Sequence, residues 1–268
     1  MIKIRCLILL CALSGLIGCS SAPERDYQVN TYQRQASAWL AQGDRKRQLG
    51  AYQQALQYYD NAYRYASKRH DVAQMGLARL KQAAVYIKLG QGKLAESKIA
   101  QAAEFARFEQ TELMPAIDFM RSKLAFSRGE QAQAQSILSK LQAQYGDQPE
   151  KQVYYRWVGW QYAPDRLDWL QAGQDMQLLA KMKADRTLKN IEILSFVIYH
   201  NVLWRVAFGQ QDVPQAIEAA ITHFASLELT NRLIDCFEIA KQYYLSLGDE
   251  ARAQYYQTRL IEVSGFGR

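Results

Sequence analysis

The sequence predicts an all-α fold, a curved solenoid built from about six stacked helical hairpins. Apolar residues recur at helical spacing from about residue 31 to residue 265, with almost no alternation typical of strands. The chain of 268 residues contains only five prolines, which leave few forced helix breaks. Gly50, Gly90 and Gly129 punctuate the first half at intervals of 40 and 39 residues. Recurrence at this period indicates stacked helical pairs.

The first unit shows how each predicted hairpin is built. Small residues let its two helices approach closely, and aromatic residues fill the space beside them. Gly50 can adopt the left-handed conformation that ends a helix and reverses the chain. The unit resembles a tetratricopeptide repeat, with signature positions at Trp39, Gly43, Gly50, Ala55, Tyr59 and Ala62. It departs from the family at Gln42 and Lys46, where leucine and tyrosine are usual.

Further units follow the first. Turns are predicted at Gly90 and Gly129, and again at Asp212 and Gly248 near the C-terminus. The segment between these groups, from Gln152 to Ala184, holds three tryptophans and a proline, and we interpret it as one degenerate hairpin. The repeat exceeds the 34 residues usual in the family, which indicates longer helices or looser linkers. Since one hairpin buries only one face, residues 31–265 form a single stacked repeat domain.

The first residues predict export. Basic residues precede an apolar run from Cys6 to Ile17, and polar residues follow it. This layout is typical of a signal peptide, which we place at residues 1–18. The apolar run is shorter than the roughly 20 residues that a membrane-spanning helix needs. The mature chain is therefore not expected to span a membrane.

The end of this segment predicts a lipid anchor. Residues 16–19, Leu-Ile-Gly-Cys, resemble the bacterial lipobox, in which the cysteine becomes the new N-terminus and is acylated. The resemblance implies a covalent diacylglycerol and an N-acyl lipid on Cys19, and residues 19–30 then form a lipidated tether. It also implies that Ser20 sorts the protein to the periplasmic face of the outer membrane. An ordinary signal peptide with a chance cysteine is the alternative.

The amino-acid composition of the chain limits which classes of function it can have. The formal net charge is +7, and the basic residues are scattered rather than gathered with aromatics, so no nucleic-acid partner is expected. Cys6 and Cys11 lie in the signal peptide and Cys19 is the acylation site, which leaves Cys236 without an intramolecular partner. Its position on an apolar helix predicts a buried structural thiol.

The sequence contains no constellation of catalytic residues. Its three histidines are isolated and lack metal-ligand spacing, and no phosphate-binding loop or nucleophile elbow is present. We therefore expect neither an enzyme, nor a metal site, nor a cofactor other than the lipid.

A concave groove along the first helices of the hairpins is the predicted binding surface. Solenoids of this kind use their concave side to hold extended partners. By analogy with the family, the groove is lined by Asp44, Arg47, Lys88, Phe119, Lys123, Phe126, Asn201 and Arg205. Basic and aromatic side chains together would suit a peptide that carries acidic groups.

These features predict a periplasmic lipoprotein that serves as a protein-interaction scaffold. Its partner would be a protein or peptide of the cell envelope, in pilus or secretin assembly or in outer-membrane machinery. The alternative is a regulator of peptidoglycan synthesis or remodelling, or a glycan-binding module that uses the segment from Trp157 to Trp169. The aromatic density of that segment more often indicates core packing.

Overall fold

The computed structural model describes residues 30–109 and 112–265, and 12 α-helices with no strand make up this part of the chain. The predicted signal peptide and nearly all of the predicted tether lie outside the described residues. The predicted all-α class is confirmed. The helices are α2 (Thr31–Gln48), α3 (Tyr52–Arg69), α4 (Val72–Lys88), α5 (Gly92–Glu109), α6 (Met114–Ser127), α7 (Gln131–Gln144), α8 (Pro149–Tyr162), α9 (Trp169–Ala184), α10 (Ile191–Ala207), α11 (Val213–Ser226), α12 (Thr230–Ser246) and α13 (Glu250–Gly265).

Glycines close the first helix of most hairpins. Gly50, Gly90 and Gly129 have φ of 73°, 71° and 80°. Residues other than glycine rarely adopt this left-handed backbone conformation. At the first turn, the amide of Gly50 donates to the carbonyl of Arg47 and the amide of Ala51 donates to that of Lys46. These bonds satisfy carbonyls left free at the helix end. Gly209 and Gly248 repeat the conformation in the C-terminal half.

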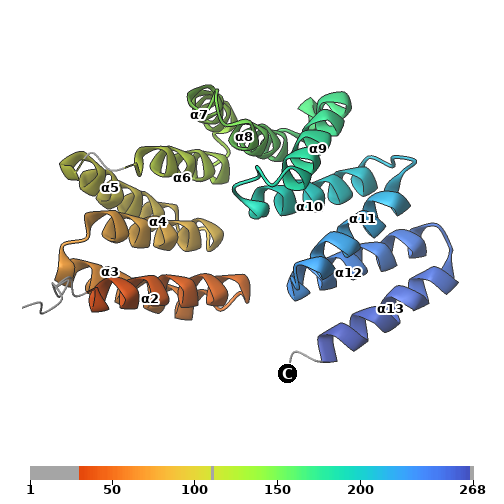
Figure 1. Cartoon of the computed structure of the whole chain (residues 1–268), viewed down its shortest axis with the longest axis horizontal. Coiled ribbons are helices and arrows are strands. Elements are labelled where there is room, and N and C mark those ends of the chain that lie inside the picture. Colours follow the sequence, from red (N-terminus) through yellow and green to blue (C-terminus); the bar gives the residue numbers. More distant parts are fainter. Residues whose placement is uncertain (1–29, 110–111, 266–268) are drawn as a thin grey trace, which may run out of the picture.

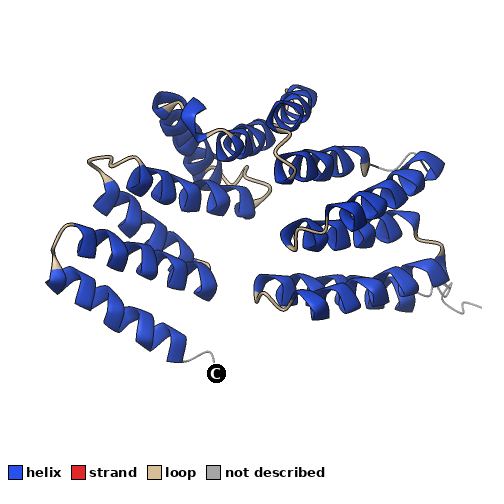
Figure 2. Cartoon of the chain, turned by 180° about the vertical axis from the view of Figure 1, so that it is seen from behind, coloured by secondary structure: helices blue, strands red, loops and turns tan. Residues whose placement is uncertain are grey.

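The six hairpins follow one another along an arc. Figures 1 and 2 show α2 and α3 at one end of the arc, α12 and α13 at the other, and an opening between them. The first helices of neighbouring hairpins contact one another, α2 with α4, α4 with α6, α8 with α10 and α10 with α12. Each second helix instead packs against the first helix of the next hairpin, for example α3 against α4. The first helices therefore form the inner layer of the curve.

The fourth hairpin, α8 and α9, departs from this regular packing. A short 3-10 turn, η2 (Pro164–Arg166), replaces the usual glycine turn between its helices. Asp175 of α9 is 2% exposed and accepts hydrogen bonds from Arg156 and from Trp157 Nε1 of α8, the latter at 2.9 Å. Gln171 Nε2 is a third donor to this carboxylate and lies 3.0 Å from Asp175 Oδ1. One buried carboxylate thus joins two helices whose backbones diverge.

Apolar side chains form a core that runs through the whole stack. Each interface buries small residues against large ones, as where Ala55 and Ala62 of α3 flank the fully buried Tyr59. Cys236 of α12 lies in the last such cluster, and burial raises the pKa of its thiol to about 12. A thiol with such a pKa is protonated at neutral pH and unreactive. Cys236 is therefore structural, as predicted.

The buried histidines of α10 and α11 are expected to make the stability of the fold depend on pH. Burial lowers the pKa of His200, and it lowers that of His223 from 6.5 to about 4. The ring Nε2 of His223 lies 2.9 Å from Ser195 Oγ. Between pH 6.5 and pH 4, the unfolded chain binds a proton at His223 that the folded chain does not bind. The contribution of neutral His223 to the free energy of unfolding is therefore fully present above pH 6.5 and is lost as the pH falls towards 4.

We expect His223→Gln to weaken this pH dependence. The free energy of unfolding, measured by urea titration at a series of pH values, should fall by about 1–3 kcal/mol more in the wild-type protein than in the variant between pH 6.5 and pH 4. Glutamine keeps a polar group for Ser195 but does not titrate. Parallel curves for the two proteins would show that His223 is not the group responsible.

Candidate functional site

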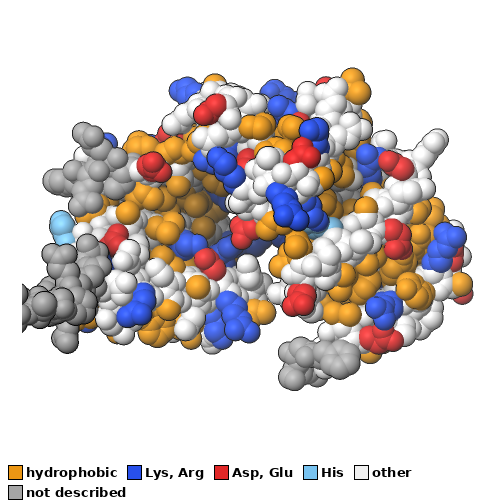
Figure 3. Space-filling model, in the orientation of Figure 1, with side chains coloured by type: hydrophobic (Ala, Val, Ile, Leu, Met, Phe, Trp, Pro, Cys, Tyr) orange, Lys and Arg blue, Asp and Glu red, His pale blue; other side chains and the backbone are white. Residues whose placement is uncertain are grey.

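The inner layer of first helices forms the candidate binding surface. Figure 3 shows that this face is hollowed between the two halves of the arc, and that Lys and Arg side chains gather in the hollow beside a few acidic ones. The hollow is broad rather than a deep enclosed pocket. Such a surface suits an extended ligand better than a compact small molecule.

Asp44 of α2 organises the N-terminal end of this surface. Its carboxylate accepts a hydrogen bond from Tyr59 Oη at 2.7 Å and pairs with Lys81 Nζ at 2.5 Å. Burial and the neighbouring Asp44 charge raise the pKa of Tyr59, which therefore stays a hydrogen-bond donor. Within the described residues, Asp44 pairs with Lys81 and forms no ion pair with Arg47 or Lys123.

Arg47 and Lys123 are the uncompensated cations. They lie on α2 and α6, yet they are close enough for the Arg47 charge to act on Lys123. Burial first, and Arg47 second, lower the pKa of Lys123 to about 8. Within the described part of the chain, neither residue forms an ion pair with a carboxylate. The ammonium of Lys123 lies 4.4 Å from the centre of the Phe119 ring instead.

A row of aromatic rings continues from this basic end. Phe119 of α6 packs edge-on against Tyr154 of α8 at 5.5 Å, and Tyr154 packs against Phe196 of α10 at 5.1 Å. Phe196 in turn lies 4.1 Å from the ring of His200. All distances are between ring centres. The row runs across α6, α8 and α10, which are the first helices of three hairpins. It begins at Phe119, so the positive charge of Lys123 lies next to the aromatic surface.

Six of the eight predicted groove residues belong to this inner layer. Asp44, Arg47, Phe119 and Lys123 make the contacts described above. Lys88 is exposed at the end of α4, two turns beyond Lys81 on the same face. Phe126 is 39% exposed and stacks on Tyr162 with ring centres 4.1 Å apart.

The other two predicted groove residues face elsewhere. Asn201 is only 4% exposed, on the face of α10 that packs against the fourth hairpin. Arg205 donates to Asn201 Oδ1, pairs with Asp212 and lies over the Trp169 ring at 5.2 Å. The placement of both residues in the groove was wrong, because they lie about half a helical turn away from Phe196 around α10.

The structure adds three residues to the predicted set: Lys81, Tyr154 and Phe196. Lys81 could have been found from the sequence, since it precedes Lys88 by two helical turns and so shares its face. Nothing in the sequence distinguishes Tyr154 from the adjacent Tyr155, which is buried.

Two of the three tryptophans of the fourth hairpin are core residues. Trp157 is fully buried, Trp160 is 8% exposed, and Trp204 of α10 stacks on Trp157 with ring centres 5.0 Å apart. Trp169 is partly buried and packs edge-on against Phe208. Stacking on a sugar needs an exposed ring face, which Trp157 and Trp160 do not offer.

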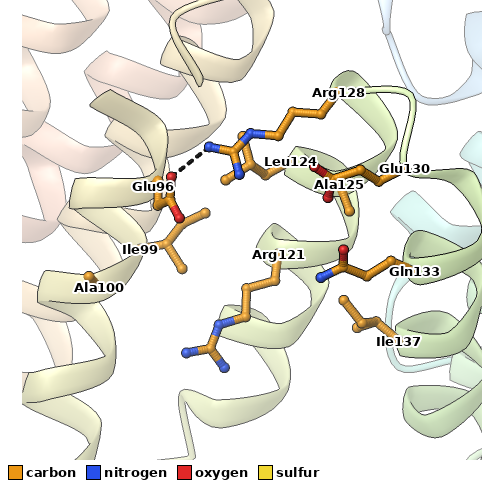
Figure 4. A pocket seen from close by; sticks show the side chains of 10 residues that line it. All are labelled: Glu96, Ile99, Ala100, Arg121, Leu124, Ala125, Arg128, Glu130, Gln133 and Ile137. Carbon is orange, nitrogen blue, oxygen red and sulfur yellow. Dashed lines mark hydrogen bonds and ion pairs between the residues drawn. The ribbon is translucent and has the colours of Figure 1, made fainter. Parts of the chain in front are cut away.

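A separate cavity opens on the outer side of α6. Its volume is about 300 Å³, and its walls come from α5, α6 and α7. Figure 4 shows an ion pair between Arg128 and Glu96, 2.6 Å long, along one edge, with Ile99, Leu124 and Ile137 on the walls. Arg121, which also lines the cavity, pairs with Asp118 outside it.

No group of His, Cys, Asp and Glu in the described residues is arranged to hold a metal ion. None of the helices in residues 30–109 and 112–265 is both long and apolar enough to cross a membrane.

The fold and its inner layer define a helical-repeat protein. No protein-family model matches the chain, and no curated protein matches it. Among solved structures, the chain is similar to a Rap protein in the crystal structure of its complex with Competence and Sporulation Factor. The TM-score is 0.57 with 13% sequence identity, over 86% of this chain and 75% of that chain. The predicted tetratricopeptide-like α-solenoid is confirmed by this likeness, which at such identity concerns the fold alone.

Proposed function

We propose that the protein is a lipid-anchored scaffold that holds an extended segment of a partner protein in its concave groove. The observation that carries the proposal is the inner layer itself, where Lys123 adjoins the aromatic row at Phe119 and where neither Lys123 nor Arg47 forms an ion pair within the described residues. A surface with uncompensated charge beside aromatic rings is suited to a partner. The likeness to a Rap protein solved with a bound factor also supports it. No catalytic role is proposed.

The location is part of the proposal and rests on the sequence. The lipobox at residues 16–19 supports acylation of Cys19, and Ser20 supports retention at the periplasmic face of the outer membrane. The residues up to 30 would then tether the repeat domain close to that membrane. Partners in pilus or secretin assembly, in outer-membrane machinery or in control of peptidoglycan enzymes all fit this position. The glycan-binding alternative loses its support, because Trp157 and Trp160 are buried.

Crosslinking in intact cells, followed by mass spectrometry, tests the scaffold. The full-length protein should recover the same envelope protein in repeated experiments. Cys19→Ser should release the protein from the membrane fraction and reduce that recovery, because the anchor raises the local concentration of both partners. Absence of any reproducible partner, under conditions that capture other envelope complexes, would contradict the scaffold. Membrane association that survives Cys19→Ser would contradict the anchor alone.

A further inference from the structure

We infer that the basic end of the groove binds a carboxylate of the partner between Arg47 and Lys123, and that the aromatic row takes an apolar side chain beside it. The ligand is then an acidic segment of a protein, in which an Asp or Glu side chain neighbours an aromatic or aliphatic one. This inference rests on the proposed scaffold function and specifies its ligand.

Positive charge on the inner layer is only partly balanced. Within the described residues, Lys81 of α4 pairs with Asp44, whereas Arg47 of α2 and Lys123 of α6 form no ion pair. Burial first, and repulsion by the Arg47 charge second, lower the pKa of Lys123. An anion seated between Arg47 and Lys123 removes the repulsion and gains hydrogen bonds from both charged groups.

The protein holds Lys123 in place. Its ammonium lies 4.4 Å from the Phe119 ring centre, a contact that fixes an ammonium without neutralising it. Asp44 accepts hydrogen bonds from Tyr59 at 2.7 Å and from Lys81 at 2.5 Å. Lys123 is therefore positioned before a ligand arrives, which lowers the entropy lost on binding.

The basic end of the groove and the aromatic row are continuous. Phe119 contacts both Lys123 and Tyr154, and Tyr154 leads on to Phe196. A ligand that places a carboxylate at Lys123 therefore has aromatic surface directly alongside. A free phosphate or a lipid headgroup would use the cations and leave the row empty, whereas an extended peptide uses both.

Selection from a random-peptide display library tests the inference on the full-length protein in mild detergent. We expect the enriched peptides to carry Asp or Glu next to an aromatic or aliphatic residue. A labelled copy of an enriched peptide should bind about tenfold more weakly to Lys123→Met and to Arg47→Met than to the wild type, since each change removes a charge-assisted hydrogen bond. Lys123→Arg should retain binding.

Lys140→Met is the matched control, because Lys140 is exposed on α7, outside the inner layer. It should leave binding unchanged, and circular dichroism should show the same helix content in every variant. Replacing the acidic residues of the peptide by Asn or Gln should weaken binding as much as Lys123→Met does. Phe119→Ser should weaken binding of the acidic peptide as well, because it removes the start of the aromatic row.

The outcomes separate this inference from the scaffold function. Enrichment of uncharged peptides, or equal binding of the acidic and amide peptides, overturns the carboxylate site and leaves the scaffold standing. Enrichment of no peptide, together with binding to anionic lipid vesicles that depends on Arg47 and Lys123, assigns the site to a membrane surface and overturns the inference. Enrichment of no peptide, with no partner recovered in cells, counts against both.

Discussion

Asp175→Ala is expected to lower the free energy of unfolding by about 3 kcal/mol. The change removes the acceptor shared by Arg156, Trp157 and Gln171. It leaves the indole of a fully buried tryptophan and a largely buried guanidinium without their partner. Because these bonds join α8 and α9 where the backbones diverge, the loss should also loosen the middle of the arc. Urea denaturation, followed by circular dichroism, measures the effect.

Asp185→Ala on the same helix is the matched control. Asp185 pairs with Lys181 at 2.9 Å, but both side chains are more than half exposed. A surface pair of this kind contributes about 0–1 kcal/mol. Equal loss of stability in the two variants would mean that the buried carboxylate does not hold the fourth hairpin together.

Gly43→Ala should destabilise the first hairpin by about 2 kcal/mol. A methyl group at this position would lie 2.4 Å from Cε1 of the Tyr59 ring. The ring cannot move aside, because it is fully buried and its hydroxyl is bonded to Asp44. The strain should therefore spread to the basic end of the groove, and the melting temperature should fall with it.

Gly173→Ala separates this steric effect from the intrinsic preference of helices for alanine. Gly173 lies within α9, and a methyl group there would meet nothing within 4 Å. That change should raise stability by up to about 1 kcal/mol. If Gly43→Ala is stabilising too, the close approach of α2 and α3 is not required.

The fold could be predicted from the sequence because each hairpin is specified locally. The spacing of Gly50, Gly90 and Gly129 marks the turns, and small residues such as Ala55 mark where helices approach. The turn between α8 and α9 lacks a glycine, so only Pro164 indicated a break there. The lone Asp175 gave no signal of its role, because an acid on a helix is usually solvated.

The groove could be predicted only in part. The analogy with the family selected Phe119, Lys123 and Phe126, whose spacing of four and three residues puts them on one face of α6. On α10 apolar residues face three directions, with Val197 packed toward the fourth hairpin and Val202 toward α11. Asn201 was therefore assigned to the groove, although it faces the core.

Position-resolved photocrosslinking in living cells tests the central claim, that the inner layer holds the partner. A photoreactive amino acid is placed at Lys88 or Phe126, which are exposed on the inner layer, and at Lys93 or Lys140, which are exposed on the second helices. The account predicts a strong crosslink to one envelope protein from the two inner positions and none from the outer ones. A crosslink to that protein from the outer positions alone would contradict it.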